Sequence, residues 1–236
     1  MEIEIKLSPV YPHTAEKIME STLHFVSAPK VFNMAADYFD TPCRELKKAG
    51  LTLRLRREND LGVCCLKYRV SNTARFEAEE SADTVEDGIS LLLNRQDLSE
   101  NIKNILKTAH VIPLYSSSFK RISRLVQQEK SVIELSFDCG YLKQQDRFLP
   151  ISEIELELKE GEEKDMVTLA RTLCKDYSLS VFTHSKAQRA AGLTEEAFAK
   201  MTPVTLEKPT DEEIYSGKVF ISKNDENLVY YRKNEE

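Results

Sequence analysis

The chain lacks several features that mark common classes of protein. It has no polybasic run, and 33 Lys plus Arg against 39 Asp plus Glu give a net charge of -6, which argues against a general nucleic-acid binder. The N-terminus is charged from residue 2 without the apolar core of a signal peptide, and no apolar run approaches the roughly 20 residues that span a bilayer. We therefore expect a soluble, cytoplasmic protein that binds neither nucleic acid nor membrane.

Cysteine and histidine are arranged in ways that exclude two further kinds of site. The five cysteines are odd in number and form no C-x-x-C pair, which suits a reducing compartment better than a disulfide framework. The four histidines are scattered along the chain, so a zinc site or a nucleophilic site built on histidine has little support. Packing and surface positions are the expected roles of these histidines.

What the sequence does contain is a set of strands with charged polar faces. In residues 1–7, the side chains of Glu2, Glu4 and Lys6 share one face of a strand, and apolar side chains occupy the other. The same alternation returns in residues 151–159. A charged sheet face normally points to water, but this repetition indicates a shared use for the charge.

The complementary charge lies between these two segments. Arg54 and Arg56 alternate with leucines on one strand, and Lys67 and Arg69 share a face of the next. The apolar faces of all these strands must be covered, and if helices cover them, the charged faces point inward. Buried charges cost several kcal/mol each unless they are paired or bind a ligand. A cavity with an acidic and a basic wall would hold metal ions and a polyanion together.

The order of predicted elements favours an α+β fold, a closed eight-stranded antiparallel β-barrel that forms a tunnel with a charged interior and flanking helices. The expected strands are residues 1–7, 30–41, 51–58, 61–70, 73–82, 116–127, 132–142 and 148–159. The expected helices begin at Pro12, form a turn within 42–50, occur twice within 84–109 and span 162–176.

Two regions follow from this pattern, a tunnel domain over residues 1–200 and a tail over residues 201–236. The tail contains two apolar segments around residues 224–227 that could form a small hairpin. It is too short for a second domain and carries no recognisable chemistry. Packing or dimer formation is its expected role, so a homodimer stays an open alternative.

The charged strands carry a specific signature. Glu2, Glu4 and Lys6 form an E-x-E-x-K pattern, and further motifs follow it in order. They are Tyr38–Pro42, Leu53–Arg56, Leu66–Lys67, Phe119–Arg121, Glu134–Asp138, Glu153–Leu158 and Ser185–Arg189. Together they resemble the CYTH superfamily, also called triphosphate tunnel metalloenzymes, over residues 1 to about 200. The resemblance is greatest to the bacterial inorganic triphosphatase branch.

This resemblance implies roles for individual residues. The catalytic residues are expected to be Glu4, Lys6 and Arg56, with Glu4 orienting or deprotonating the attacking water. The substrate-binding positions are Lys6, Arg54, Arg56, Lys67, Arg121, Lys186 and Arg189. The metal-binding positions are Glu2, Glu4, Asp138, Glu153 and Glu155, whose hard oxygen ligands favour Mg²⁺ or Mn²⁺.

For three further charged residues, the sequence pattern has to be weighed between a place in the site and a place at its rim or on the outer surface. Glu157 shares the inward face of its strand, and it either joins the site or forms an ion pair at the tunnel mouth. Glu77 either supports the site residues from behind or is an exposed charge at the rim, and the rim is the favoured alternative. Arg124 lies three residues after Arg121 and should point to the outer surface, since side chains alternate along a strand.

The expected function is metal-dependent hydrolysis of inorganic triphosphate, or a related triphosphate, to orthophosphate and pyrophosphate. Triphosphate carries roughly four negative charges, and its transfer requires cations more than a protein nucleophile. The alternatives are a thiamine triphosphatase and a class IV adenylyl cyclase, which would form cyclic AMP from ATP. Outside enzymology, the alternative is a polyphosphate-binding module, although such a module gains nothing from an acidic wall without metal.

Overall fold

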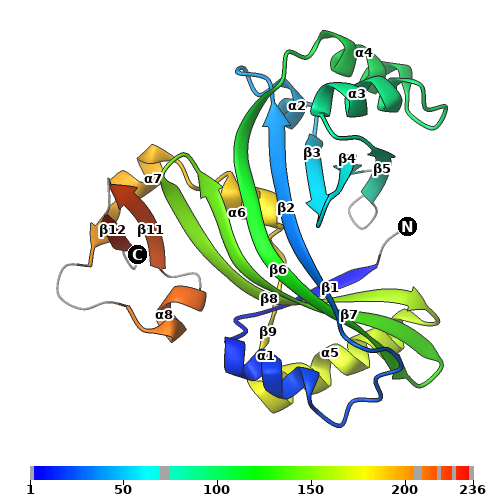
Figure 1. Cartoon of the computed structure of the whole chain (residues 1–236), viewed down its shortest axis with the longest axis vertical. Helices are drawn as coiled ribbons and strands as arrows, with labels where there is room; N and C mark the ends of the chain where they lie inside the picture. Colours follow the sequence, from blue (N-terminus) through cyan, green and yellow to red (C-terminus); the bar gives the residue numbers. More distant parts are fainter. Residues whose placement is uncertain (1–2, 70–74, 205–208, 217–218, 225–226, 234–236) are drawn as a thin grey trace. The chain divides into compact units, whose positions relative to one another are not determined.

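The structure is a computed structural model that describes residues 3–69, 75–204, 209–216, 219–224 and 227–233. The chain divides into two units (Figure 1). Unit 1 is Asn33–Ser118, and unit 2 is Glu2–Phe32 together with Phe119–Glu236. Each unit is described by itself.

Unit 1 contains an antiparallel run of four strands with helices on one face, and the start of a fifth strand, residues 112–118, lies beside the first of the four. The strands follow the order β2 (Lys30–Asp40, from Asn33 onward), β3 (Leu51–Glu58), β4 (Leu61–Arg69) and β5 (Arg75–Ser81). The helices are α2 (Glu45–Lys48), α3 (Val85–Leu93) and α4 (Glu100–Thr108). Alternation in β3 buries its leucines in an apolar core shared with α3 and α4. The opposite face of β3 therefore presents Arg54 and Arg56.

The contact between α3 and β4 requires a glycine. A Cβ atom added to Gly88 would lie 2.1 Å from Cβ of the buried Cys64, so the helix could not keep its position. We expect Gly88→Ala to lower the free energy of unfolding by about 1–3 kcal/mol through overpacking. Urea denaturation measures this change, with Ser90→Ala on the exposed side of the same helix as the control. Equal stability of the two variants would contradict this packing.

Unit 2 is built on a long antiparallel hairpin of β7 (Ser131–Gln144) and β8 (Arg147–Glu160). The last part of β6 (Ile112–Gln128) lies beside β7, and β1 (Glu4–Ser8) pairs with β8. The remaining elements are α1 (Pro12–Met19), α5 (Glu163–Tyr177), β9 (Ser180–Phe182), α6 (Lys186–Ala190) and α7 (Glu195–Ala199). The apolar faces of β1, β7 and β8 form one core with α1 and α5, and their other faces carry the charged residues.

The C-terminal segment continues unit 2. It consists of β10 (Met201–Pro203), α8 (Asp211–Tyr215), β11 (Val219–Asn224) and β12 (Asn227–Lys233). The expected hairpin is present, since β11 and β12 pair antiparallel. β11 also pairs with β8, where Ile221 lies opposite Phe148. The domain boundary near residue 200 stays a prediction.

The predicted antiparallel sheet with flanking helices is confirmed, but the number of strands is higher than expected. The eight expected strands correspond to β1–β8, β11 and β12 form the expected hairpin, and the described residues contain two more strands, β9 and β10. Each of these two has only three residues, which is too short for a periodic pattern to reveal. Closure of the strands into a barrel stays a prediction. Within the described ranges, no helix has both the length and the hydropathy to span a bilayer.

Candidate active site

Three carboxylates converge on the charged face of the β7–β8 hairpin in unit 2. Glu153 and Glu155 are two residues apart on β8 and so share a face, and Asp138 of β7 lies directly opposite Glu153. All three are buried, and one oxygen of each lies within 4.8 Å of the others. We call these residues the acidic triad. Such a group is stable only when cations compensate its charge.

Two cations contact the triad most extensively. The ammonium of Lys186 lies 2.7 Å from Asp138, 2.5 Å from Glu153 and 2.8 Å from Glu155. The Arg121 guanidinium donates two hydrogen bonds of 2.7 Å to Asp138 in a fork and also contacts Glu155. The triad is therefore fully paired by groups of the chain itself.

Lys6 joins this group from β1. It lies opposite Glu155 in the β1–β8 pairing, and its Nζ atom is 2.5 Å from Glu155 and 2.6 Å from Glu4. Arg189 contacts Glu153. The result is a balanced set of four carboxylates and four cations, which we call the buried ionic cluster after its buried centre, the acidic triad and Lys186, although Glu4 is exposed: Glu4, Asp138, Glu153, Glu155, Lys6, Arg121, Lys186 and Arg189.

Local sequence explains how Lys186 reaches the triad. Ser185 and Gln188 form a capping box, in which each side chain accepts a hydrogen bond from the other's backbone N–H. The box starts α6 immediately before Lys186, so this lysine occupies the first turn and its side chain is held against the hairpin. Residues 185–188 are thus sufficient to set where α6 begins.

The cluster shifts the ionisation of its members. Burial by itself would raise the pKa of Glu155, but the charges of Lys186, Lys6 and Arg121 outweigh it and hold the pKa well below its ordinary value. Burial would lower the pKa of Lys186, but Asp138, Glu153 and Glu155 raise that pKa well above its ordinary value. Glu155 and Lys186 are therefore both charged at neutral pH.

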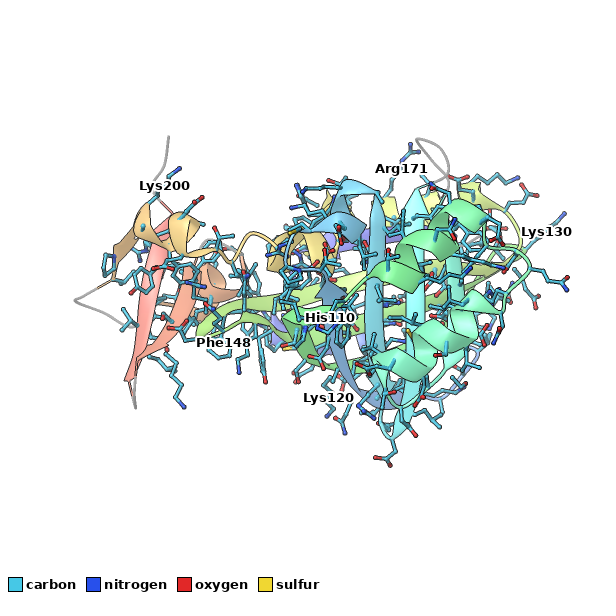
Figure 2. The ribbon with its side chains drawn as sticks, turned by 90° about the horizontal axis from the view of Figure 1, so that it is seen from above. His110, Lys120, Lys130, Phe148, Arg171 and Lys200 are labelled. Atoms are coloured by element: carbon cyan, nitrogen blue, oxygen red, sulfur yellow. The ribbon has the colours of Figure 1, made fainter. Side chains whose placement is uncertain are left out.

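Lys120 and Arg124 lie on β6, as Arg121 does, but their side chains do not contact the acidic triad. Lys120 is exposed, and it projects from the ribbon as Lys130 does (Figure 2). Arg124 points away from the triad, as expected, and it is partly buried against the segment after α1. Its guanidinium lies 3.6 Å from the Phe25 ring centroid and donates a hydrogen bond of 2.8 Å to the Met19 carbonyl oxygen. Arg124 therefore contacts the segment between α1 and β2.

Unit 1 carries a second group of charges on the polar face of β3–β5. Lys67 lies 2.6 Å from Glu77, Arg54 lies 3.4 Å from Glu77, and Arg56 lies 3.2 Å from Glu79. The buried Nε atoms of Arg54 and Arg56 find no hydrogen-bond partner among the described residues. Unsatisfied buried donors of this kind suit an anionic ligand.

Glu77 lies deeper than the rim position expected for it. It faces Lys67 in the β4–β5 register, and the Cys65 thiol donates a hydrogen bond of 3.0 Å to it. Burial would raise the pKa of Glu77, but Lys67, Cys65 and Arg54 lower this pKa to about 2. Burial raises the pKa of Cys65 to about 12, so the thiol stays protonated and can donate.

This shift predicts a pH dependence of stability. The pKa of Glu77 is about 2 in the folded chain against an ordinary 4.5, so its stabilising effect is complete above pH 4.5 and is lost as pH falls toward 2. Glu77→Gln removes this titration, and the free energy of unfolding should then fall less steeply in that window. Urea denaturation from pH 2 to 6 measures it. The exposed Glu86→Gln is the control, and parallel curves for both variants would contradict the assignment.

The structure places most of the predicted site residues on charged faces. Eight of them form the buried ionic cluster of unit 2, and Arg54, Arg56 and Lys67 belong to unit 1. Glu2 lies outside the described residues. Glu157 forms an ion pair of 2.7 Å with Lys159, and a position at a tunnel mouth stays a prediction. The catalytic, substrate-binding and metal-binding roles themselves stay predictions.

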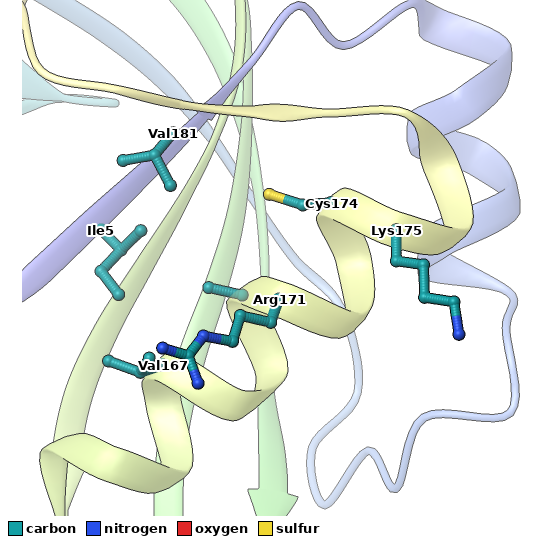
Figure 3. A pocket seen from close by; sticks show the side chains of 7 residues that line it. Ile5, Val167, Arg171, Cys174, Lys175 and Val181 are labelled. Carbon is teal, nitrogen blue, oxygen red and sulfur yellow. The ribbon is translucent and has the colours of Figure 1, made fainter.

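A pocket elsewhere in unit 2 contains none of these residues. It has a volume of about 510 Å³ and lies between α5, β1 and β9. Ile5 and Val181 face Val167 and Cys174 across it (Figure 3). Its lining is mostly apolar, which does not suit a polyanion such as triphosphate.

Comparison with known proteins identifies the class. The family model described as the CYTH domain matches residues 1–191, so the chain belongs to the CYTH domain family. An inorganic triphosphatase from Haemophilus influenzae is 26% identical over 194 residues, which cover 80% of this chain and 53% of that protein. The chain therefore spans about half the length of this curated relative.

A solved structure supports the fold. It belongs to a candidate adenylyl cyclase from Hippeastrum, whose structure is described as revealing a dominant triphosphatase activity. The two structures align with a TM-score of 0.52 at 20% identity, over 81% of this chain and 96% of the other. This likeness shows a shared fold, and the activity has to be argued from the site.

Proposed function

We propose that the protein hydrolyses inorganic triphosphate, or a related triphosphate, to orthophosphate and pyrophosphate with the help of Mg²⁺ or Mn²⁺. The observation that carries the proposal is the buried ionic cluster within the family region. It brings three carboxylates within 4.8 Å of one another and pairs them with lysine and arginine side chains. The distant relationship to an inorganic triphosphatase supports the choice of substrate.

The acidic triad fits a divalent metal ion. Its ligand atoms are all carboxylate oxygens that lie within 4.8 Å of one another, the hard donors that Mg²⁺ and Mn²⁺ prefer. Asp138, Glu153 and Glu155 would hold the ion, with Glu4 beside them. When bound, a metal ion of this kind neutralises phosphate oxygens and activates water for attack.

The cations would bind the substrate. Triphosphate carries about four negative charges, which arginine forks and lysine ammonium groups can pair. In unit 2, the binding groups are Lys6, Arg121, Lys186 and Arg189; in unit 1 they are Arg54, Arg56 and Lys67. The closed tunnel predicted from the sequence is part of the proposal. Buried Nε donors without a partner on Arg54, Arg56 and Arg189, among the described residues, support an anionic ligand.

Hydrolysis then needs a proton acceptor and charge stabilisation. Glu4 is the least buried carboxylate of the cluster, with 28% of its side chain exposed, so it is accessible to a water molecule. In the proposal Glu4 orients this water and accepts its proton. Lys6 and Arg56 stabilise the charge that develops on the phosphate oxygens.

A product assay tests the proposal. The full chain is incubated with triphosphate, thiamine triphosphate or ATP, each with Mg²⁺, with Mn²⁺ or with a chelator, and the products are separated by ion chromatography. We expect orthophosphate and pyrophosphate from triphosphate, faster turnover of triphosphate than of ATP, no cyclic AMP, and no turnover in chelator. Cyclic AMP as the main product would indicate a cyclase instead, and binding without turnover would indicate a polyphosphate-binding module.

A further inference from the structure

The ammonium of Lys186 lies at the centre of the acidic triad. It is 2.5–2.8 Å from one oxygen of each carboxylate, and only 10% of its side chain is exposed. A Mg²⁺ ion bound by the same three residues would lie about 2.0–2.1 Å from their oxygens. Both cations would then share one small space, where their charges repel strongly. The triad can hold Lys186 or a metal ion, but not both in these positions.

We propose that Lys186 is an internal counter-ion that competes with the divalent metal for Asp138, Glu153 and Glu155 and leaves the triad when the metal binds. This inference rests on the proposed function and adds an order of events to it. Lysine suits the role because its ammonium is a single point charge on a flexible four-carbon stem. An arginine fork would be harder to withdraw from three carboxylates.

Other partners for the Lys186 ammonium lie close to the triad. Its Nζ atom lies 4.8 Å from the centroid of the Phe119 ring, whose face can attract a cation as it moves. A triphosphate bound beside the metal offers it phosphate oxygens in exchange for the carboxylates. Metal and triphosphate should therefore strengthen each other's binding, because each favours the state in which Lys186 has left the triad.

The other cations of the cluster do not block the triad in this way. Lys6 contacts only Glu155 of the three carboxylates, and Arg189 contacts only Glu153. Arg121 contacts Asp138 and Glu155 from one side. Lys6→Met and Lys186→Met each remove one positive charge near the triad, but only Lys186→Met vacates its centre. The pair therefore separates competition for one position from a general effect of charge.

The first test is calorimetric titration of Mn²⁺ into the full chain without triphosphate. We expect Lys186→Met to bind Mn²⁺ at least about tenfold more tightly than the wild type, within the usual range of coupling between two ligands. Lys6→Met should give a clearly smaller gain. Equal gains in both variants, no gain in Lys186→Met, or no Mn²⁺ binding in any of the proteins would overturn the proposal.

A second measurement needs no variant. The wild type is treated briefly with acetic anhydride, with and without Mg²⁺, and the acetylated fraction of each lysine is read by peptide mass spectrometry. Acetylation of Lys186 should rise several-fold with Mg²⁺, whereas the exposed Lys130 should not change. Protection of Lys186 at saturating Mg²⁺ would overturn the proposal. Both tests omit triphosphate, so their results do not depend on hydrolysis. A failure of the competition proposal can therefore be distinguished from a failure of the proposed function.

Discussion

Glu155→Gln is expected to reduce triphosphate hydrolysis by about a hundredfold or more. Losing even an outer contact of a metal site typically costs about 10–100-fold, and Glu155 is a proposed direct ligand. It also faces Lys6, Arg121 and Lys186, so the substitution removes one charge from the centre of the cluster while keeping the shape of the side chain. Steady-state phosphate release at saturating Mg²⁺ measures the effect.

The control for this variant lies on the same strand. Glu160→Gln changes an exposed residue near the end of β8 and should leave activity unchanged. Melting curves of both variants show whether a loss of activity reflects unfolding. Near-normal activity of a folded Glu155→Gln protein would remove Glu155 from the proposed site and leave the family assignment intact.

Arg121→Met is expected to lower the free energy of unfolding by about 3 kcal/mol, the lower part of the range for breaking a buried ion pair. Asp138 is fully buried and would lose both hydrogen bonds of the guanidinium fork. The remaining contact with Lys186 keeps the loss from being larger. Urea denaturation measures the change, with the exposed Arg171→Met on α5 as the control. A difference below about 0.5 kcal/mol between these variants would show that the fork contributes little.

Alternation along the strands made much of the fold predictable. β3 has the bounds predicted for it, and β4 and β5 end within two residues of theirs. The two short helices expected within residues 84–109 are α3 and α4. Burial on one face of a strand imposes a strict period of two, so local sequence is enough to show which side chains share a face.

Pairing between strands was harder to predict. The importance of Glu77 depends on its position opposite Lys67, which the β4–β5 register determines and local sequence does not. Cys65 was likewise not recognised as a donor to this carboxylate. The contact of Arg124 with Phe25 depends on how the segment after α1 folds back over β6. Each of these residues is positioned by a partner distant in sequence.

The pairing of β11 with β8 shows that the region matched by the family model is shorter than the region that forms one sheet. The family match ends at residue 191, but the tip of the β7–β8 hairpin hydrogen-bonds with residues 221 and 222. A protein trimmed to the family region would expose the backbone of Phe148 and Arg147 as an open strand edge. Because open edges can pair with strands of other molecules, we expect such a trimmed protein to aggregate more readily than the full chain.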